Sequence, residues 1–212
     1  MNLIVLLIIG INVLVSWKGF NDPYFRSKYL FYVGRIFEGE RYRMFTSGFL
    51  HADWMHLIFN MYALYFFSGV VFNEFHLLNF LLIYFGSLFV GNFISLLFHK
   101  HEYNYTALGA SGAVSGIMYA SIMLAPLREI ALFPIPIPMP SYVFGIAYLL
   151  YTIYGMKKQI GNIGHSAHLG GAATGFALTL MMKPSLFVDQ KWLVLALAVP
   201  LILLFIFEKR FR

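Results

Sequence analysis

The sequence predicts an all-α membrane protein that crosses the bilayer several times. Of its 212 residues, 60% are hydrophobic and only 11% are charged, and the mean hydropathy is +0.73. A water-soluble domain carries roughly a quarter charged residues, so this chain cannot cover a surface that faces water. The hydrophobic residues are grouped into seven stretches, near the ~17–25 residues that a spanning helix needs. Cysteine is absent, which excludes disulfides and thiolate metal sites.

Each of the seven apolar stretches predicts one helix. The first has no basic residue ahead of it and no small-residue cleavage site, so we expect a retained helix; a cleaved signal peptide would leave six spans. Several stretches are short, which a protein that thins the bilayer tolerates. The stretches cover residues 2–17, 52–72, 77–98, 108–126, 141–156, 166–182 and 192–207.

The connections between the stretches show two local patterns. Residues 18–50 interleave aromatic and basic side chains, which suits a segment lying in the membrane interface, with a turn at Asn21-Asp22-Pro23. Residues 134–140 contain a proline at every second position, which excludes a helix and predicts an extended connector. The net charge of +6 is scattered over these connections, so the lipid bilayer is the expected partner and nucleic acid is not.

Polar side chains stand at the start of three of the stretches. His51, His56 and Asn60 open the second, Ser111 opens the fourth and His168 opens the sixth. Even-numbered helices of a chain that winds back and forth enter from the same side, so the three groups should lie near one membrane face. Polar groups are costly in lipid and therefore indicate function. His56 and Asn60 share a helical face. His51 fits an interface histidine as well as a catalytic helper.

Two glycine pairs predict that the fourth and sixth helices pack closely. Gly112 and Gly116 follow Ser111, and Gly171 and Gly175 follow His168, each in GxxxG spacing. Small residues at this spacing let transmembrane backbones approach. Either pair alone is most often plain packing. Together they would bring Ser111 and His168 to a common end.

The chemistry that these groups allow is acyl transfer. A serine hydroxyl needs a base, and a neutral His168 at a helix start suits that role. His56, Asn60 and the backbone N–H of Ser111 could stabilise an oxyanion. All nine acidic residues lie in connections or at stretch ends, so a Ser–His dyad is expected, not a triad. No metal or cofactor is expected, since no His-Glu-x-x-His motif is present and His165 with His168 lacks a third ligand. The other histidines (His76, His99, His101 and His165) are expected in loops.

These motifs resemble those of the rhomboid intramembrane serine proteases over about residues 1–183. The matching segments are residues 51–60, 109–112 and 167–171 with Gly175, in the family's order. The resemblance implies a six-helix core at 1–183, with an added C-terminal transmembrane helix and basic tail at 184–212. It implies Ser111 as nucleophile, His168 as base, and His56 and Asn60 as oxyanion donors. Substrates would be single-span membrane proteins.

Further features follow from the same resemblance. Residues 157–165 would form a cap over the site, and the fifth stretch would form a substrate gate. Tyr42-Arg43 resembles the family's Trp-Arg pair. Two positions depart from the pattern: Ser115 stands where many rhomboids place an aromatic that packs on the catalytic histidine, and Asn73 stands where a glutamate is common.

The resemblance implies a multi-pass protein of a bacterial cytoplasmic membrane, with the site opening to the outer face. Loop charges argue for the opposite orientation, because twelve Lys and Arg would lie outside and three inside. An alternative function is a catalytically silent rhomboid-like protein that binds transmembrane helices. A proton-coupled transporter is weaker, since no acid lies within a span. The sequence determines neither the substrate nor the oligomeric state.

Overall fold

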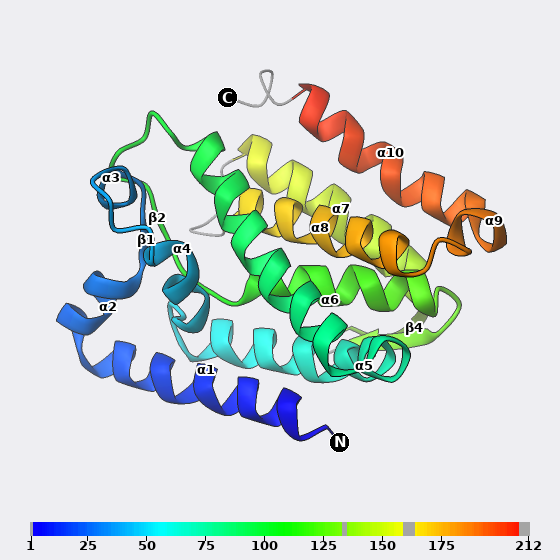
Figure 1. Cartoon of the computed structure of the whole chain (residues 1–212), viewed down its shortest axis with the longest axis horizontal. Helices are drawn as coiled ribbons and strands as arrows, with labels where there is room; N and C mark the ends of the chain where they lie inside the picture. The colour runs from blue at the N-terminus through cyan, green and yellow to red at the C-terminus, as the bar shows by residue number, and fades with distance from the viewer. Residues whose placement is uncertain (1, 133–134, 159–163, 208–212) are drawn as a thin grey trace.

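Each of the seven apolar stretches lies in a helix (Figure 1). A computed structural model describes residues 2–132, 135–158 and 164–207. The first helix ends four residues later than predicted, because it continues to Asn21 before Asp22 and Pro23 begin the next one. Asp22 caps that helix by accepting a hydrogen bond from the Phe25 N–H at 2.9 Å. The predicted turn at 21–23 is therefore the junction of two helices.

The elements follow one another along the chain with short connections. They are α1 (Leu3–Asn21), α2 (Pro23–Tyr29), β1 (Phe31–Tyr32), α3 (Val33–Phe37), α4 (Arg43–Thr46), η1 (Ser47–Phe49), α5 (Trp54–Phe98), β2 (Thr106–Ala107), α6 (Ser111–Leu124), β3 (Glu129–Leu132), β4 (Ile135–Pro140), α7 (Ser141–Lys158), α8 (His165–Met182), α9 (Leu186–Asp189) and α10 (Lys191–Phe207).

Helix α5 holds the second and third stretches and is broken between them. His76 has φ 58° and ψ −168°, far from helical values, and the chain changes direction there (Figure 1). Helices α1 and α5 are long and apolar enough to cross a membrane, with hydropathies of 2.2 and 2.0. Helices α6, α7 and α10 contain shorter apolar segments.

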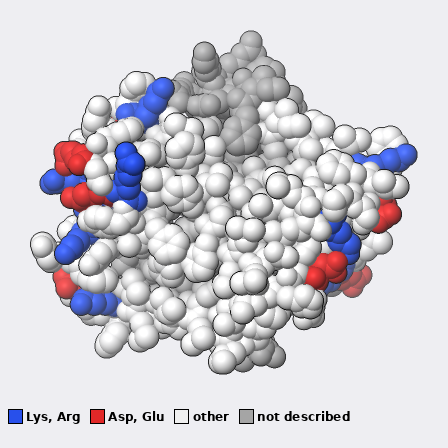
Figure 2. Space-filling view, in the orientation of Figure 1, with Lys and Arg blue, Asp and Glu red and all other residues white. Residues whose placement is uncertain are grey.

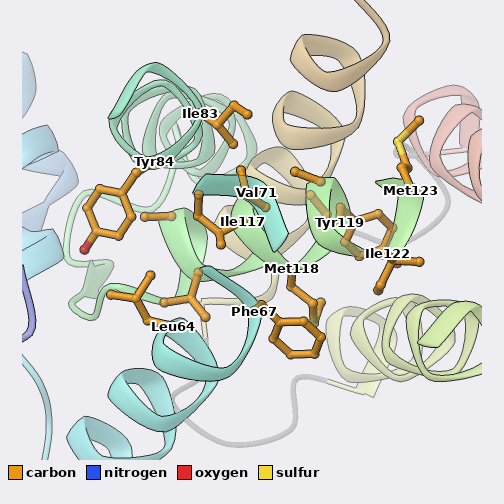
Figure 3. Close-up of a cluster of buried hydrophobic side chains, with 14 of the residues drawn as sticks. Leu64, Phe67, Val71, Ile83, Tyr84, Ile117, Met118, Tyr119, Ile122 and Met123 are labelled. Carbon is orange, nitrogen blue, oxygen red and sulfur yellow. The ribbon is translucent and has the colours of Figure 1, made fainter. Parts of the chain in front are cut away.

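Helix α6 forms the centre of the hydrophobic core. All its residues from Gly112 to Met123 are buried. Figure 3 shows side chains of α6 meeting those from both halves of α5, among them Phe67, Tyr84 and Ile117. A helix that is apolar on all sides is stable when neighbours surround it, and α5, α7 and α8 supply those neighbours. The N-terminal end of α6, where Ser111 lies, is therefore held on several sides.

The described part of the chain is mostly helical, in agreement with the prediction, and also contains two small antiparallel sheets that the sequence did not predict. In the first sheet, Phe31 pairs with Ala107 and Tyr32 with Thr106, which ties the long first connection to the segment just before Ser111. In the second, Glu129 pairs with Pro140 across a hairpin. Strands of two residues are too short for alternating hydrophobicity to reveal them. The predicted extended connector is one arm of the hairpin, where alternate prolines fit an edge strand.

Candidate active site

A left-handed glycine turn places Ser111 at the first position of α6. Gly109 has φ +132°, a conformation that side chains other than glycine rarely adopt. The Gly109 N–H donates to the Ser47 carbonyl at 3.0 Å, and the Ala110 N–H points to His51 Nε2 at 3.4 Å. The turn is thus fixed by two contacts from the segment before α5.

His51 is a buried link between α1 and the turn that carries Ser111. Its side chain is 1% exposed. Ser16 Oγ donates its hydrogen to the Phe49 carbonyl at 2.9 Å, so it accepts from His51 Nδ1 at 2.8 Å. The proton therefore resides on Nδ1, and Nε2 accepts from Ala110. Burial lowers the pKa of His51 to about 3, with a further contribution from His56, so the ring stays neutral at ordinary pH.

His56 lies directly against the turn that carries Ser111. A Cβ atom at Gly109 would lie 2.8 Å from His56 Cε1, 2.9 Å from its Nε2 and 3.6 Å from Ser111 Oγ, so glycine leaves the space between the ring and the hydroxyl open. The Ala52 N–H points to His56 Nδ1 at 3.5 Å, which favours the tautomer with its proton on Nε2. The nitrogen that can donate is the one that faces the turn.

Asn60 lies one helical turn deeper than His56 on α5. It is buried, and its Nδ2 donates to the His56 carbonyl at 3.0 Å. An amide group carries two hydrogens, so a second one can be donated. Asn60 and His56 are therefore coupled, with their donors on one helical face.

His168 lies in the first turn of α8, where its N–H donates to the Gly164 carbonyl at 3.1 Å. Its ring stacks on Tyr148 of α7, with centroids 6.0 Å apart and planes at 23°. The ring of His165 meets it edge-on at 6.1 Å and 74°. His165 itself begins α8 and is buried, so its predicted loop position is wrong.

Glycines let α6 and α8 meet backbone to backbone beside the site. A side chain at Gly171 would collide with the Gly112 backbone, and one at Gly175 would collide with Gly116. A Cβ at Gly112 would lie 3.3 Å from the Ala167 carbonyl oxygen. The residue after Ser111 thus packs on the residue before His168.

Ser115 links α6 to α7, the helix whose Tyr148 ring stacks on His168. Its Oγ donates to the Ser111 carbonyl at 2.7 Å and lies 2.7 Å from the Tyr148 hydroxyl. The aromatic ring on His168 therefore comes from α7 in this chain, and not from position 115. Tyr148 was not predicted, because nothing in its spacing distinguishes it from the other tyrosines among the 14 of the chain.

Within residues 2–132, 135–158 and 164–207, no hydrogen bond joins Ser111 Oγ to His168. Catalytic hydrogen bonds are often long before substrate binds. Of the predicted cap at 157–165, residues 159–163 lie outside the described residues. The described part of the chain contains no group of three side chains suited to hold a metal ion.

Arg43 of the Tyr42-Arg43 pair holds the first connection together. Buried Arg43 donates to the carbonyls of Ser27 and Leu30 at 2.8 and 2.9 Å and pairs with Glu40 at 2.6 Å. That hydrogen bond from Arg43 lowers the pKa of the Glu40 carboxyl. A buried guanidinium that reaches two carbonyls and a carboxylate can hold several loop segments together.

Comparison with known proteins identifies the family. Residues 38–185 match the Rhomboid domain. The chain is 30% identical to RHOMBOID-like protein 12, mitochondrial, of Arabidopsis thaliana (79% of this chain, 54% of that one). It is 30% identical to Rhomboid protein 1, mitochondrial, of Saccharomyces cerevisiae (79% and 50%), and 31% identical to Rhomboid-like protein 11, chloroplastic, of Arabidopsis thaliana (70% and 56%).

The chain spans about half the length of these curated relatives. The Rhomboid domain match covers the segments that hold His56, Asn60, Ser111 and His168. The resemblance drawn from three short motifs is therefore confirmed at the level of the whole domain: this chain belongs to the rhomboid family of membrane proteins.

Proposed function

We propose that this chain is an intramembrane serine endopeptidase that cleaves peptide bonds in or near transmembrane segments. The observation that carries the proposal is the meeting of two helix starts. Ser111 begins α6, His168 lies in the first turn of α8, and Gly112 packs on Ala167 between them. Polar side chains are costly in an apolar core. A serine and a histidine at such a junction therefore indicate a nucleophile and a base.

The reaction needs only groups of this chain and a water molecule. Neutral His168 takes the proton of Ser111 Oγ as the oxygen attacks the scissile carbonyl, and later gives it to the leaving amine. The oxyanion accepts hydrogen bonds from His56 Nε2, the Asn60 amide and the Ser111 N–H. The last group suits this role because the N–H groups of a first helical turn lack intrahelical partners. Water then hydrolyses the acyl-enzyme.

We propose a multi-pass arrangement in the bilayer, with the six-helix core at 1–183 and α10 as an added C-terminal span. The surface charge supports this, because Figure 2 shows charged side chains gathered at two opposite ends and none on the central face between them. The basic tail lies at 208–212, outside the described residues. The relatives' names place them in mitochondria or chloroplasts, so a bacterial membrane with an outward-facing site stays a prediction.

Substrates would be single-span membrane proteins whose helix unwinds locally. An intact helix keeps its carbonyls in hydrogen bonds, so the scissile bond must leave helical geometry before Ser111 can attack. The donors around Ser111 lie at the ends of α5, α6 and α8, where an extended peptide would have to bind. Entry beside α7 would agree with the gate expected from the family.

The test is cleavage of a labelled single-span substrate by the purified protein in lipid vesicles. We expect the wild type to cleave, and Ser111→Ala and His168→Ala to lose cleavage while keeping their helical content. Ser121→Ala removes another buried serine of α6 and should retain cleavage. Equal cleavage by the wild type and Ser111→Ala would disprove the proposed mechanism.

The second candidate is a silent rhomboid-like protein that binds transmembrane helices without cutting them. The absence of a Ser111–His168 hydrogen bond among the described residues favours it. In the same vesicles, binding of the substrate without cleavage by the wild type would support this function. Cleavage that depends on Ser111 would exclude it.

A further inference from the structure

Tyr148 connects the two residues of the proposed dyad, although it lies on a third helix. Its ring stacks on His168 at 6.0 Å and 23°, and its hydroxyl lies 2.7 Å from Ser115 Oγ. Ser115 donates its single hydrogen to the Ser111 carbonyl at 2.7 Å, so the Tyr148 hydroxyl must donate to Ser115. A continuous path therefore runs from the Ser111 backbone through Ser115 and Tyr148 to the His168 ring.

The stack restricts the orientation of the imidazole. A histidine in the first turn of a helix can rotate about two side-chain bonds. Tyr148 lies against the plane of the ring, whereas His165 meets it edge-on at 6.1 Å. Among the described aromatic contacts of His168, Tyr148 is thus the flat surface that sets the plane of the ring.

Helix α7 carries Tyr148 to this position through a second contact with α6. The Tyr119 hydroxyl donates to the Gly145 carbonyl at 2.6 Å, one turn away from the Ser115–Tyr148 hydrogen bond. Ser115 and Tyr119 are four residues apart on α6, and Gly145 and Tyr148 are three apart on α7, so each pair shares a face. The two bonds fix how α7 lies along α6.

We propose that Tyr148 is a positioning residue for His168, anchored by Ser115, so that the geometry of the dyad depends on the docking of α7 against α6. This inference rests on the proposed protease function. Tyr148 acts through His168 and needs no contact with substrate. A movement of α7 away from α6 would therefore disturb the base as well as widen the path to it.

The kinetic test compares Tyr148→Leu, Tyr148→Phe and Ser115→Ala in the vesicle assay. Loss of the ring should lower kcat on the order of 10²-fold with KM within about twofold, because the base is misplaced while substrate contacts remain. Tyr148→Phe keeps the ring and should recover most of that loss. Ser115→Ala removes the hydrogen bond that Tyr148→Phe removes, together with the bond to the Ser111 carbonyl, so the double variant should be no slower than Ser115→Ala alone.

Tyr119→Phe is the matched control. It removes the other hydroxyl bond between α6 and α7 but leaves the Tyr148 ring against His168, so its loss of kcat should be much smaller than that of Tyr148→Leu. A rise in KM alone for Tyr148→Leu, or equal losses of kcat in Tyr148→Leu and Tyr119→Phe, would overturn the positioning role. If wild type cleaves and Tyr148→Leu cleaves equally well, the proposed function stands and this inference fails.

A second readout does not require cleavage. The His168 imidazole resonance of labelled protein, assigned by its loss in His168→Ala, should shift in Tyr148→Leu because the ring current of Tyr148 is removed. It should stay in place in Tyr119→Phe. An unshifted resonance in Tyr148→Leu would contradict the stacking of Tyr148 on His168 even if the protein proves inactive. The positioning role of Tyr148 and the protease function can therefore be disproved independently.

Discussion

Helix α6 meets α8 and α7 in two different ways. With α8 the contact is backbone to backbone, because Gly112 and Gly116 lie against Gly171 and Gly175 with no room for a side chain. With α7 the contact runs through side chains, by the Ser115–Tyr148 and Tyr119–Gly145 hydrogen bonds. The first contact holds the starts of α6 and α8 close together, with Gly112 packed on Ala167. The second depends on two hydrogen bonds.

On the proposed function, the α6–α8 contact would set the distance between Ser111 and His168, and the α6–α7 contact would set the orientation of the His168 ring. Small residues in a membrane interior give close van der Waals contact, which is lost as soon as one side chain is enlarged. Hydrogen bonds between side chains contribute about 1 kcal/mol each and can be lost one at a time. We therefore expect the α6–α8 contact to contribute more to stability, and the α6–α7 contact to affect the orientation of the proposed base.

The largest expected effect is the loss of stability caused by Gly171→Ala in the α6–α8 contact. The added methyl group would collide with the Gly112 backbone, so we expect a loss of about 3 kcal/mol in the free energy of unfolding. Gly69→Ala is the matched control, since no atom lies within 4 Å of its Cβ position and alanine favours the helix by up to about 1 kcal/mol. Unfolding followed by circular dichroism checks both. Equal stability of the two variants would contradict close backbone packing.

Asn60→Ala tests the oxyanion donors on α5. If one amide hydrogen of Asn60 stabilises the transition state, kcat should fall on the order of 10²-fold, or about 3 kcal/mol. Asn12→Ala is the control, because Asn12 is also buried and also donates to the carbonyl four residues earlier, at 2.9 Å, but on α1. Its kcat should not change. Parallel losses in both variants would assign Asn60 a structural role.

The pH dependence of stability tests the His51 link that holds the turn before Ser111. The pKa of His51 is about 3 in the folded protein and near 6.5 when unfolded, so only the unfolded chain gains a proton between these values. The free energy of unfolding should therefore be retained above pH 6.5 and should fall toward pH 3 by up to about 1.4 kcal/mol per pH unit.

His51→Gln should remove this part of the slope, whereas His101→Gln, at an exposed position, should keep it. Denaturant titrations from pH 7 to pH 4 measure the difference. A wild-type slope identical to that of His51→Gln would show that His51 is not held neutral by burial.

The smallest expected effect belongs to the α6–α7 contact. Tyr119→Phe and Ser115→Ala should each lower the free energy of unfolding by about 1 kcal/mol, and the two losses should add within about 0.5 kcal/mol. Strong non-additivity in thermal unfolding would mean that the two hydrogen bonds form one rigid unit, and the contrast with the α6–α8 contact would disappear.

The sequence was most informative where lipid restricts composition. Long apolar stretches are obligatory for spanning helices, so the polar exceptions Ser111 and His168 stand out and their motifs identify the family. The same reasoning located the four glycines. What the sequence left open depends on contacts between distant segments. His51 bonds to Ser16, 35 positions away, and β1 pairs with β2 over only two residues.

Tyr148 was beyond prediction for a related reason. An aromatic at position 115 would have been visible as a fixed spacing from Ser111, but this chain provides the ring from another helix. Helical periodicity reports which face of one helix is apolar, and not which residue of a neighbour it meets. The serine at position 115 was nevertheless informative. It lies 2.7 Å from the hydroxyl of Tyr148, the residue that provides the aromatic ring instead.

Covalent labelling tests the central claim most directly. The wild-type protein in vesicles would be treated with a fluorophosphonate, and the modified residue identified by mass spectrometry. An activated serine is attacked far faster than an ordinary hydroxyl, so the account predicts one adduct, on Ser111, that is absent in Ser111→Ala and strongly reduced in His168→Ala, and is retained in Ser121→Ala. Labelling of Ser111 at the same rate with and without His168, or no labelling of Ser111 at all, would contradict it.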